Sequence, residues 1–218
     1  MLNKTNKTAA KLALENGQAE VAKLIVKCKV DGNIRNNIRS TPLDIAQYGA
    51  DEGWEGEGNA WLQAAAEEGD IEVVKSWLER GIDVNGHNSS DWSPLDKAAY
   101  KGKADVTCLL VERGTEVNSR DKQGWTALHL ASLHGQLEVS QVLVDHGANV
   151  NARQKNHWTP LNLLACNGHL EVVKLLLECG ADVHALSSEG ETAYQVSLQR
   201  GHREVTDLLW EHGAGRAR

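Results

Sequence analysis

The sequence predicts an all-α solenoid, a stack of short helix pairs, and three observations support this prediction. Motifs typical of helix starts recur at a constant interval along much of the 218-residue chain. Glycines recur at the same interval. Apolar residues between those glycines follow the three- and four-residue spacing of an amphipathic helix. A pair of helices this short cannot bury its own apolar face, so neighbouring pairs must stack.

The first element of each unit is a short helix that begins after a Thr or Ser. Such a side chain at the N-cap accepts a hydrogen bond from an unpaired backbone N–H, and proline fits the first helical position. Segments that match this helix-start motif weakly, or that lie outside the regular series, begin at Thr8, Thr41 and Ala60. The clear motifs are evenly spaced: Ser-Pro-Leu-Asp (93–96), Thr-Ala-Leu-His (126–129), Thr-Pro-Leu-Asn (159–162) and Thr-Ala-Tyr-Gln (192–195).

A glycine nine residues after the Thr/Ser position ends the first helix, and another glycine twelve residues later ends the second. Glycine suits the left-handed conformation at a helix end. An extended turn such as Ala-Asn-Val-Asn-Ala (148–152) follows, and its Asn side chains are expected to bond their own backbone. The first glycines are Gly69, Gly102, Gly135, Gly168 and Gly201, and the second are Gly81, Gly114, Gly147, Gly180 and Gly213.

The motif Gly-x-Thr-Ala-Leu-His-Leu-Ala (124–131), with Gly-Ala-Asn-Val-Asn-Ala (147–152), resembles the ankyrin repeat. The resemblance extends without a gap over residues 60–213. It implies a curved array with β-turn fingers at right angles to the helices, and a concave binding face made of fingertips and first helices. We expect five repeats, at 60–92, 93–125, 126–158, 159–191 and 192–213, followed by a tail at 214–218.

The regular pattern breaks on the N-terminal side. Thr41 and Ala60 lie too close together for a full unit, which leaves no room for a second helix between them. The intervening Gly-Ala-Asp-Glu-Gly-Trp-Glu-Gly-Glu-Gly (49–58) is acidic, rich in glycine and lacks an apolar stripe. We therefore predict one ankyrin unit and a truncated second unit at 1–48, and an irregular joint at 49–59.

Charge and composition narrow the class of partner. The formal net charge is −7, with eight basic against four acidic residues in 1–48 and eight acidic residues without a base in 49–72. Phosphate binding needs a continuous basic face, so nucleic acid is not expected as a partner. No apolar run approaches the roughly 20 residues that span a bilayer, so no membrane association is expected either. With no signal peptide recognised at its start, the protein is expected to be cytoplasmic, with the nucleus not excluded.

The residues that could act in catalysis or bind a metal do not form a catalytic motif. The nine histidines lie in separate units without metal-ligand or catalytic spacing, and no phosphate-binding glycine loop occurs. The resemblance implies that the His129 side chain bonds neighbouring turn backbone and that His169 and His202 are structural, because they follow the helix-ending glycine, where the family commonly has His. His146 and His212 suit the ends of second helices. Four cysteines without a CxxC pair are predicted to be free thiols. We expect no enzyme activity, no cofactor and no metal. The cysteines are Cys28, Cys108, Cys166 and Cys179.

The candidate binding residues form a ladder of tryptophans beside variable ends of first helices. Three tryptophans in successive units directly precede the Thr/Ser position, which the resemblance places at the fingertips. Their indoles are enriched at binding hot spots, although each ring could instead pack on the next finger. The predicted partner-binding residues are Trp92, Tyr100, Lys101, Trp125, Leu133, His134, Trp158 and Asn167.

These residues favour a non-catalytic scaffold that binds a protein partner on the concave face. Two alternatives stay open. The chain could be the repeat segment of a larger multidomain protein, because no polar capping unit is evident at the N-terminal side. It could also be a self-associating module, with Leu12, Leu24 and Ile25 forming weak contacts through that uncapped side.

Overall fold

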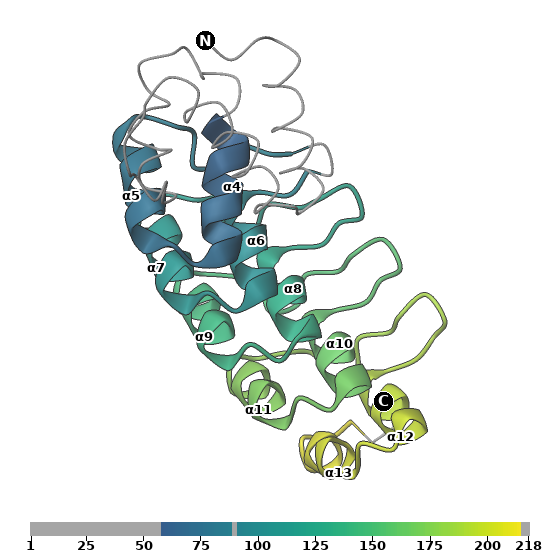
Figure 1. Cartoon of the computed structure of the whole chain (residues 1–218). Coiled ribbons are helices and arrows are strands. Elements are labelled where there is room, and N and C mark those ends of the chain that lie inside the picture. Colours follow the sequence, from purple (N-terminus) through teal and green to yellow (C-terminus); the bar gives the residue numbers. More distant parts are fainter. Residues whose placement is uncertain (1–57, 89–90, 215–218) are drawn as a thin grey trace.

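The computed structural model describes residues 58–88 and 91–214 (Figure 1). Ten α-helices and no β-strand occur within these two ranges, which confirms the all-α prediction for the repeats. None of these helices is long and apolar enough to cross a membrane. The unit predicted at 1–48, the joint up to residue 57 and the tail beyond residue 214 lie outside the described residues.

The helices form two layers, one from the first helices of the units and one from the second helices (Figure 1). Below we call them the inner and the outer layer. The inner layer consists of α4 (Gly58–Glu68), α6 (Pro94–Lys101), α8 (Ala127–Leu133), α10 (Pro160–Asn167) and α12 (Ala193–Arg200). The outer layer consists of α5 (Ile71–Glu79), α7 (Ala104–Glu112), α9 (Leu137–Asp145), α11 (Leu170–Glu178) and α13 (Arg203–Glu211).

Four of the five inner helices begin at the predicted Thr or Ser. In each of them the hydroxyl accepts a hydrogen bond from the third backbone N–H of the helix, and the third side chain accepts one in return. This reciprocal arrangement is a capping box. The third residue differs from unit to unit, and its chemistry matters below: Asp96, His129, Asn162 and Gln195.

Helix α4 is the exception. It begins at Gly58 and has eleven residues, whereas the other inner helices have seven or eight. Ala60 stands where the other units have a Thr or Ser, so no hydroxyl is present to cap the N-terminus of the helix there, and the helix begins earlier, at Gly58. Residues 58 and 59, predicted as the end of the irregular joint, are therefore helical.

The outer helices α7, α9, α11 and α13 begin without a side-chain cap. The side chain of the N-cap residue instead covers the glycine that ends the first helix of the preceding unit. The imidazole of His169 covers Gly135, where a Cβ would lie 2.4 Å from Nδ1, and its Nε2 is 3.2 Å from the carbonyl oxygen of Leu133. The absence of a side chain at Gly135 therefore lets neighbouring units approach.

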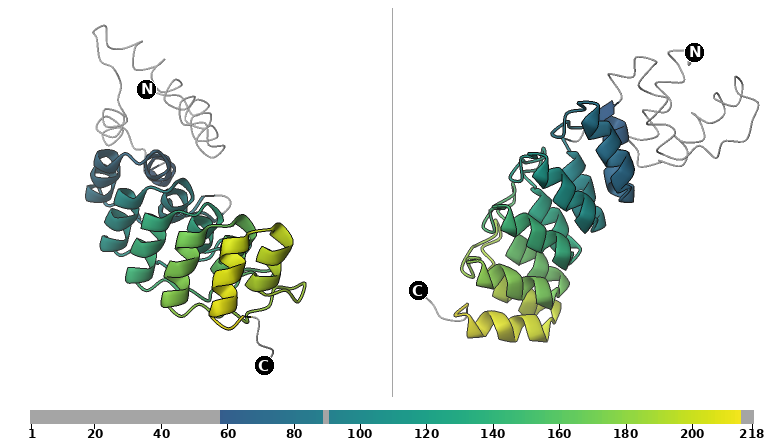
Figure 2. Two further views of the ribbon diagram at one scale, coloured as in Figure 1. Left: turned by 90° about the horizontal axis from the view of Figure 1, so that it is seen from below. Right: turned by 90° about the vertical axis from the view of Figure 1, so that its left-hand side faces the viewer.

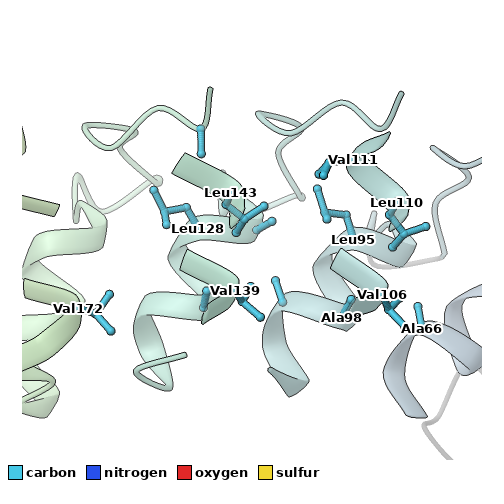
Figure 3. Packing of buried hydrophobic residues seen from close by; sticks show 14 of the residues in the cluster. Ala66, Leu95, Ala98, Val106, Leu110, Val111, Leu128, Val139, Leu143 and Val172 are labelled. Atoms are coloured by element: carbon cyan, nitrogen blue, oxygen red, sulfur yellow. The ribbon is translucent and has the colours of Figure 1, made fainter. Parts of the chain in front are cut away.

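Stacking depends on small residues in the inner layer. Ala98, Ala99 and Ala131 are completely buried, and inner helices pack more closely on one another than outer helices do. A layer with closer spacing lies on the inside of a curve, so the inner helices form the concave side. Between the layers, leucines repeat from one unit to the next, as Leu95 and Leu128 of the inner helices show in Figure 3.

The fingers project together from the helix layers (Figure 2). They are joined by Asn118 and Asn151, whose side chains contact the next finger rather than their own, which corrects the prediction for Asn151. Asn149 does accept a hydrogen bond of 3.0 Å from the backbone N–H of Asn151 in its own finger, as turn chemistry predicts. Asn118 Oδ1 accepts a hydrogen bond of 2.8 Å from the backbone N–H of Asn149, and its Nδ2 donates to the carbonyl of Gly147. Asn151 repeats this bridge one unit further on.

Candidate functional site

The three tryptophans of the ladder lie where each finger closes, not at its tip. The backbone N–H of Asp121 donates to the Trp125 carbonyl at 2.9 Å, and the Trp125 N–H donates to a carboxylate oxygen of Asp121, also at 2.9 Å. This double contact places Lys122 and Gln123 at the tip. The sequence prediction of a fingertip position is therefore wrong by a few residues, because the finger turns before it reaches the indole.

Each indole is half-buried, so one part of it packs and another part meets solvent. Trp92 is fixed most firmly, because its Nε1–H donates to Asp121 of the next finger at 3.1 Å. The packing predicted as an alternative to binding is therefore present for Trp92, and it holds the ring in place while leaving part of it accessible.

Trp92 is also the first member of an aromatic cluster that crosses two repeats. Its ring centroid lies 5.4 Å from that of Tyr100, and Tyr100 meets the ring of His134 edge-on with a centroid distance of 4.5 Å. Tyr100 is part of α6, whereas His134 directly follows α8. We refer to Trp92, Tyr100 and His134 as the aromatic cluster.

Two lysines lie over this cluster and share one carboxylate. Lys97 Nζ is 5.3 Å from the Trp92 centroid, and Lys101 Nζ is 5.4 Å from the Tyr100 centroid. Both ammonium groups contact Glu67 of α4, at 3.0 and 3.3 Å. Burial opposes ionisation of Glu67, but the hydrogen bonds and charges of the two lysines outweigh it and lower the pKa of the carboxyl.

His134 adds an aromatic ring rather than a positive charge. Partial burial, together with electrostatic repulsion from the neighbouring His169 and Lys101 side chains, lowers the pKa of the His134 imidazole below its usual range. The ring is therefore neutral at neutral pH. The cluster thus presents three half-buried or exposed rings beside Lys101, whose side chain is 43% exposed. Such a surface can bury apolar groups of a partner and offer a cation to a carboxylate or carbonyl.

The structure brings four of the eight predicted residues together, namely Trp92, Tyr100, Lys101 and His134. The remaining four have other neighbours. Trp125 lies 5.9 Å from the His129 ring, and Trp158 accepts a hydrogen bond of 3.2 Å from His129 through its carbonyl oxygen. Leu133 offers its carbonyl to His169, and the Asn167 amide donates to the carbonyl of Leu163 in its own helix.

Sequence reasoning missed Glu67 and Lys97, although the repeat register contains a signal for both. Glu67 occupies the position of Tyr100 one unit earlier, so extending the variable position back by one unit would have found it. Lys97 is a cation at a position where later units have Leu130, Leu163 and Val196. A charged residue at a repeatedly apolar position needs a partner, and Glu67 supplies it.

Three histidines outside the cluster, His129, His146 and His212, lie in the structural positions that the sequence predicts. His129 is fully buried in its capping box, and burial lowers the pKa of its imidazole to about 4. His146 and His212 each contact the carbonyl of the residue four before, at the end of an outer helix. Cys108, Cys166 and Cys179 are free thiols. Among the described residues, no group of three or more His, Cys, Asp or Glu could hold a metal ion.

Comparison with protein families agrees with this architecture. A family model described as ankyrin repeats (3 copies) matches residues 61–154, 107–187 and 152–216, so its matches together extend from residue 61 to residue 216. No curated protein matches the chain.

Proposed function

Because the chain belongs to the ankyrin-repeat family, whose members generally act as protein-binding modules, we propose that it is a non-catalytic scaffold that binds a protein partner on its concave face. The aromatic cluster with Lys101 lies at the centre of the proposed surface. The proposed location is inside the cell, in the cytoplasm or the nucleus, where thiols stay reduced.

The observation that carries this proposal is the contact of Tyr100 with His134 and Trp92 across two repeats. Aromatic residues held rigid by their neighbours bind partners with little loss of conformational entropy, and they dominate the energy of many interfaces. The Glu67 carboxylate holds Lys97 and Lys101 beside these rings, which orders two otherwise flexible side chains before a partner arrives.

Site-specific photo-crosslinking in cells tests the proposal. A photoreactive amino acid replaces His134 on the concave face or, as a control, Gln141, an exposed residue of outer helix α9. We expect a defined set of proteins to crosslink through position 134 and not through position 141. Equal crosslinking from both positions, or crosslinking from position 141 alone, would show that the concave face is not the binding surface.

A second arm measures whether Tyr100 contributes to that binding. We expect Tyr100→Ala to reduce crosslinking from position 134 by about tenfold, as loss of a hot-spot aromatic does. The matched control is Lys174→Ala, which alters an exposed pair with Glu171 in outer helix α11 and should change nothing. Circular dichroism of both variants ensures that a loss of crosslinking does not come from unfolding.

A further inference from the structure

The two central fingers concentrate positive charge in a protein of net charge −7. Residues 119–124 and 153–157 contain four basic side chains and a single carboxylate, that of Asp121. We call these four side chains the basic finger surface: Arg120, Lys122, Arg153 and Lys155.

These side chains belong to one continuous surface because the two fingers are bonded to each other. The backbone N–H of Lys155 donates to the carbonyl of Gln123 at 2.9 Å. Arg120 Nη1 donates to the carbonyl of Arg153 at 2.8 Å. Both contacts bridge one repeat, so Arg120 and Lys122 lie beside Arg153 and Lys155.

Three of the four cations, Arg120, Arg153 and Lys155, form no ion pair with a carboxylate of the described residues. Asp121 already accepts hydrogen bonds from the Trp92 indole and from its own finger backbone. Arg120 and Arg153 donate to backbone carbonyls, which carry no net charge. Lys122 faces Asp91 at 3.8 Å with both side chains about half-exposed, a pair of little energetic weight. Lys155 has no ion pair with any described residue.

Acidic residues limit the surface on every side. At the corresponding finger positions, the preceding finger carries Asp91 and the following finger carries Glu189, followed by Glu191, while Glu116 lies at the base of the first central finger. The five outer helices together contain eleven acidic residues against three basic ones. The positive surface is therefore only two repeats wide.

We propose that the basic finger surface binds a short acidic peptide segment of the protein partner. This inference rests on the proposed function and adds the chemistry of the partner. Trp125 and Trp158, half-buried at the ends of the same two fingers, offer apolar contacts beside the cations. A peptide with a few carboxylates fits two repeats, whereas a long polyanion such as nucleic acid would extend onto the flanking acidic fingers and be repelled.

Binding of three dye-labelled 12-residue peptides to the full chain tests this inference. The peptides alternate Ser with Glu, Gln or Lys, and fluorescence anisotropy reports their binding. We expect the Glu peptide to bind at least tenfold more tightly than the Gln peptide. Because the cations are exposed, we expect this affinity to fall about tenfold when salt rises from 0.05 to 0.5 M. Equal affinity for the Glu and Gln peptides would overturn the inference.

Two variants with the same change in net charge separate the finger surface from a general charge effect. Lys122→Glu/Lys155→Glu should weaken binding of the Glu peptide by at least tenfold. Lys75→Glu/Lys174→Glu, placed on outer helices α5 and α11, should leave it within twofold. Equal losses in both variants would contradict a site on the fingers, as would tighter binding of a 12-nucleotide oligothymidylate than of the Glu peptide.

The chain's own acidic residues 51, 52, 55 and 57 are another potential occupant. A variant with Asp51→Asn, Glu52→Gln, Glu55→Gln and Glu57→Gln tests this directly. Binding of the Glu peptide to the unchanged chain supports a partner segment, whereas binding to this variant alone would overturn it. Failure of the peptide assay with continued crosslinking from position 134 would reject the acidic partner and leave the proposed function intact.

Discussion

The ring of Tyr100 meets the ring of His134 edge-on across the boundary of two repeats, with centroids 4.5 Å apart. Because Trp92 and Lys101 contact the same tyrosine, this pair connects two inner helices and a finger within the proposed binding surface.

The aromatic pair should contribute modestly to stability. An edge-to-face pair is worth about 0.5–1.5 kcal/mol beyond the burial of its area. We expect a coupling free energy in this range from a double-mutant cycle of Tyr100→Leu and His134→Leu, measured by urea unfolding. A coupling near zero would mean that the two rings touch without stabilising the repeats.

Asp96 should make the protein less stable as the pH rises. Burial raises the pKa of Asp96 to about 6, despite the hydrogen bonds from Ser93. The folded state therefore holds a proton that the unfolded state has released between about pH 4 and pH 6. The stabilisation of the folded state by this bound proton is fully present below pH 4 and is lost by about pH 6. For a shift of this size it amounts to at most about 3 kcal/mol of unfolding free energy.

Asp96→Asn should remove this pH dependence. Asn162 performs the same capping role with Thr159 in α10, so the substitution preserves the capping box. Chemical unfolding at pH 4, 5 and 6 gives the comparison. An identical decline in stability for the variant and the original protein would refute the assignment to Asp96.

His129 should act with the opposite sign in the same capping position. Burial lowers the pKa of its imidazole to about 4, whereas an unfolded histidine has a pKa near 6.5. The unfolded state thus binds more protons between about pH 4 and 6.5, so this contribution to stability grows as the pH rises. We expect His129→Asn to lose that growth, by up to about 3 kcal/mol, in the same unfolding series.

Gly135 should tolerate alanine less well than Gly147. Both have positive φ angles, +64° and +82°, so alanine costs each about 1 kcal/mol in backbone strain. A Cβ at Gly135 also meets the His169 ring, whereas the space at Gly147 is open. We expect Gly135→Ala to cost about 1–3 kcal/mol more than Gly147→Ala. His169→Ala in the same chain should reduce that difference, as measured by thermal unfolding.

Ala99 and Leu198 occupy the same position in the first helices of different repeats, yet Ala99 is fully buried and Leu198 is 60% exposed. The next repeat covers Ala99, whereas no described unit follows α12 and α13 to cover Leu198. This position of the first helix therefore faces the following repeat. We expect Ala99→Leu to cost about 1–3 kcal/mol by overpacking the α6–α8 contact, and Leu198→Ala to cost less than about 0.5 kcal/mol. Similar costs at the two positions, measured by urea unfolding, would contradict this stacking geometry.

The sequence by itself determined the constant length of the repeat, the helix starts at Ser93, Thr126, Thr159 and Thr192, and the left-handed glycines that end the helices. These features follow from local chemistry, since a cap or a left-handed turn depends on residues within a few positions of one another. The same register predicted which surface positions vary between repeats. The family resemblance also predicted the backbone-bonding role of His129, whereas the contacts of His169 and His202 with the preceding repeat came from the structure.

Only the tertiary structure decided which variable residues meet. Glu67 contacts Lys97 and Lys101 from the preceding unit, and Tyr100 meets His134 of the next one. Asn118 bonds the following finger rather than its own, and Trp92 is held by Asp121. Each of these contacts joins residues of neighbouring repeats, and each depends on how closely the repeats stack and which way each side chain turns. Neither property is encoded within a single repeat.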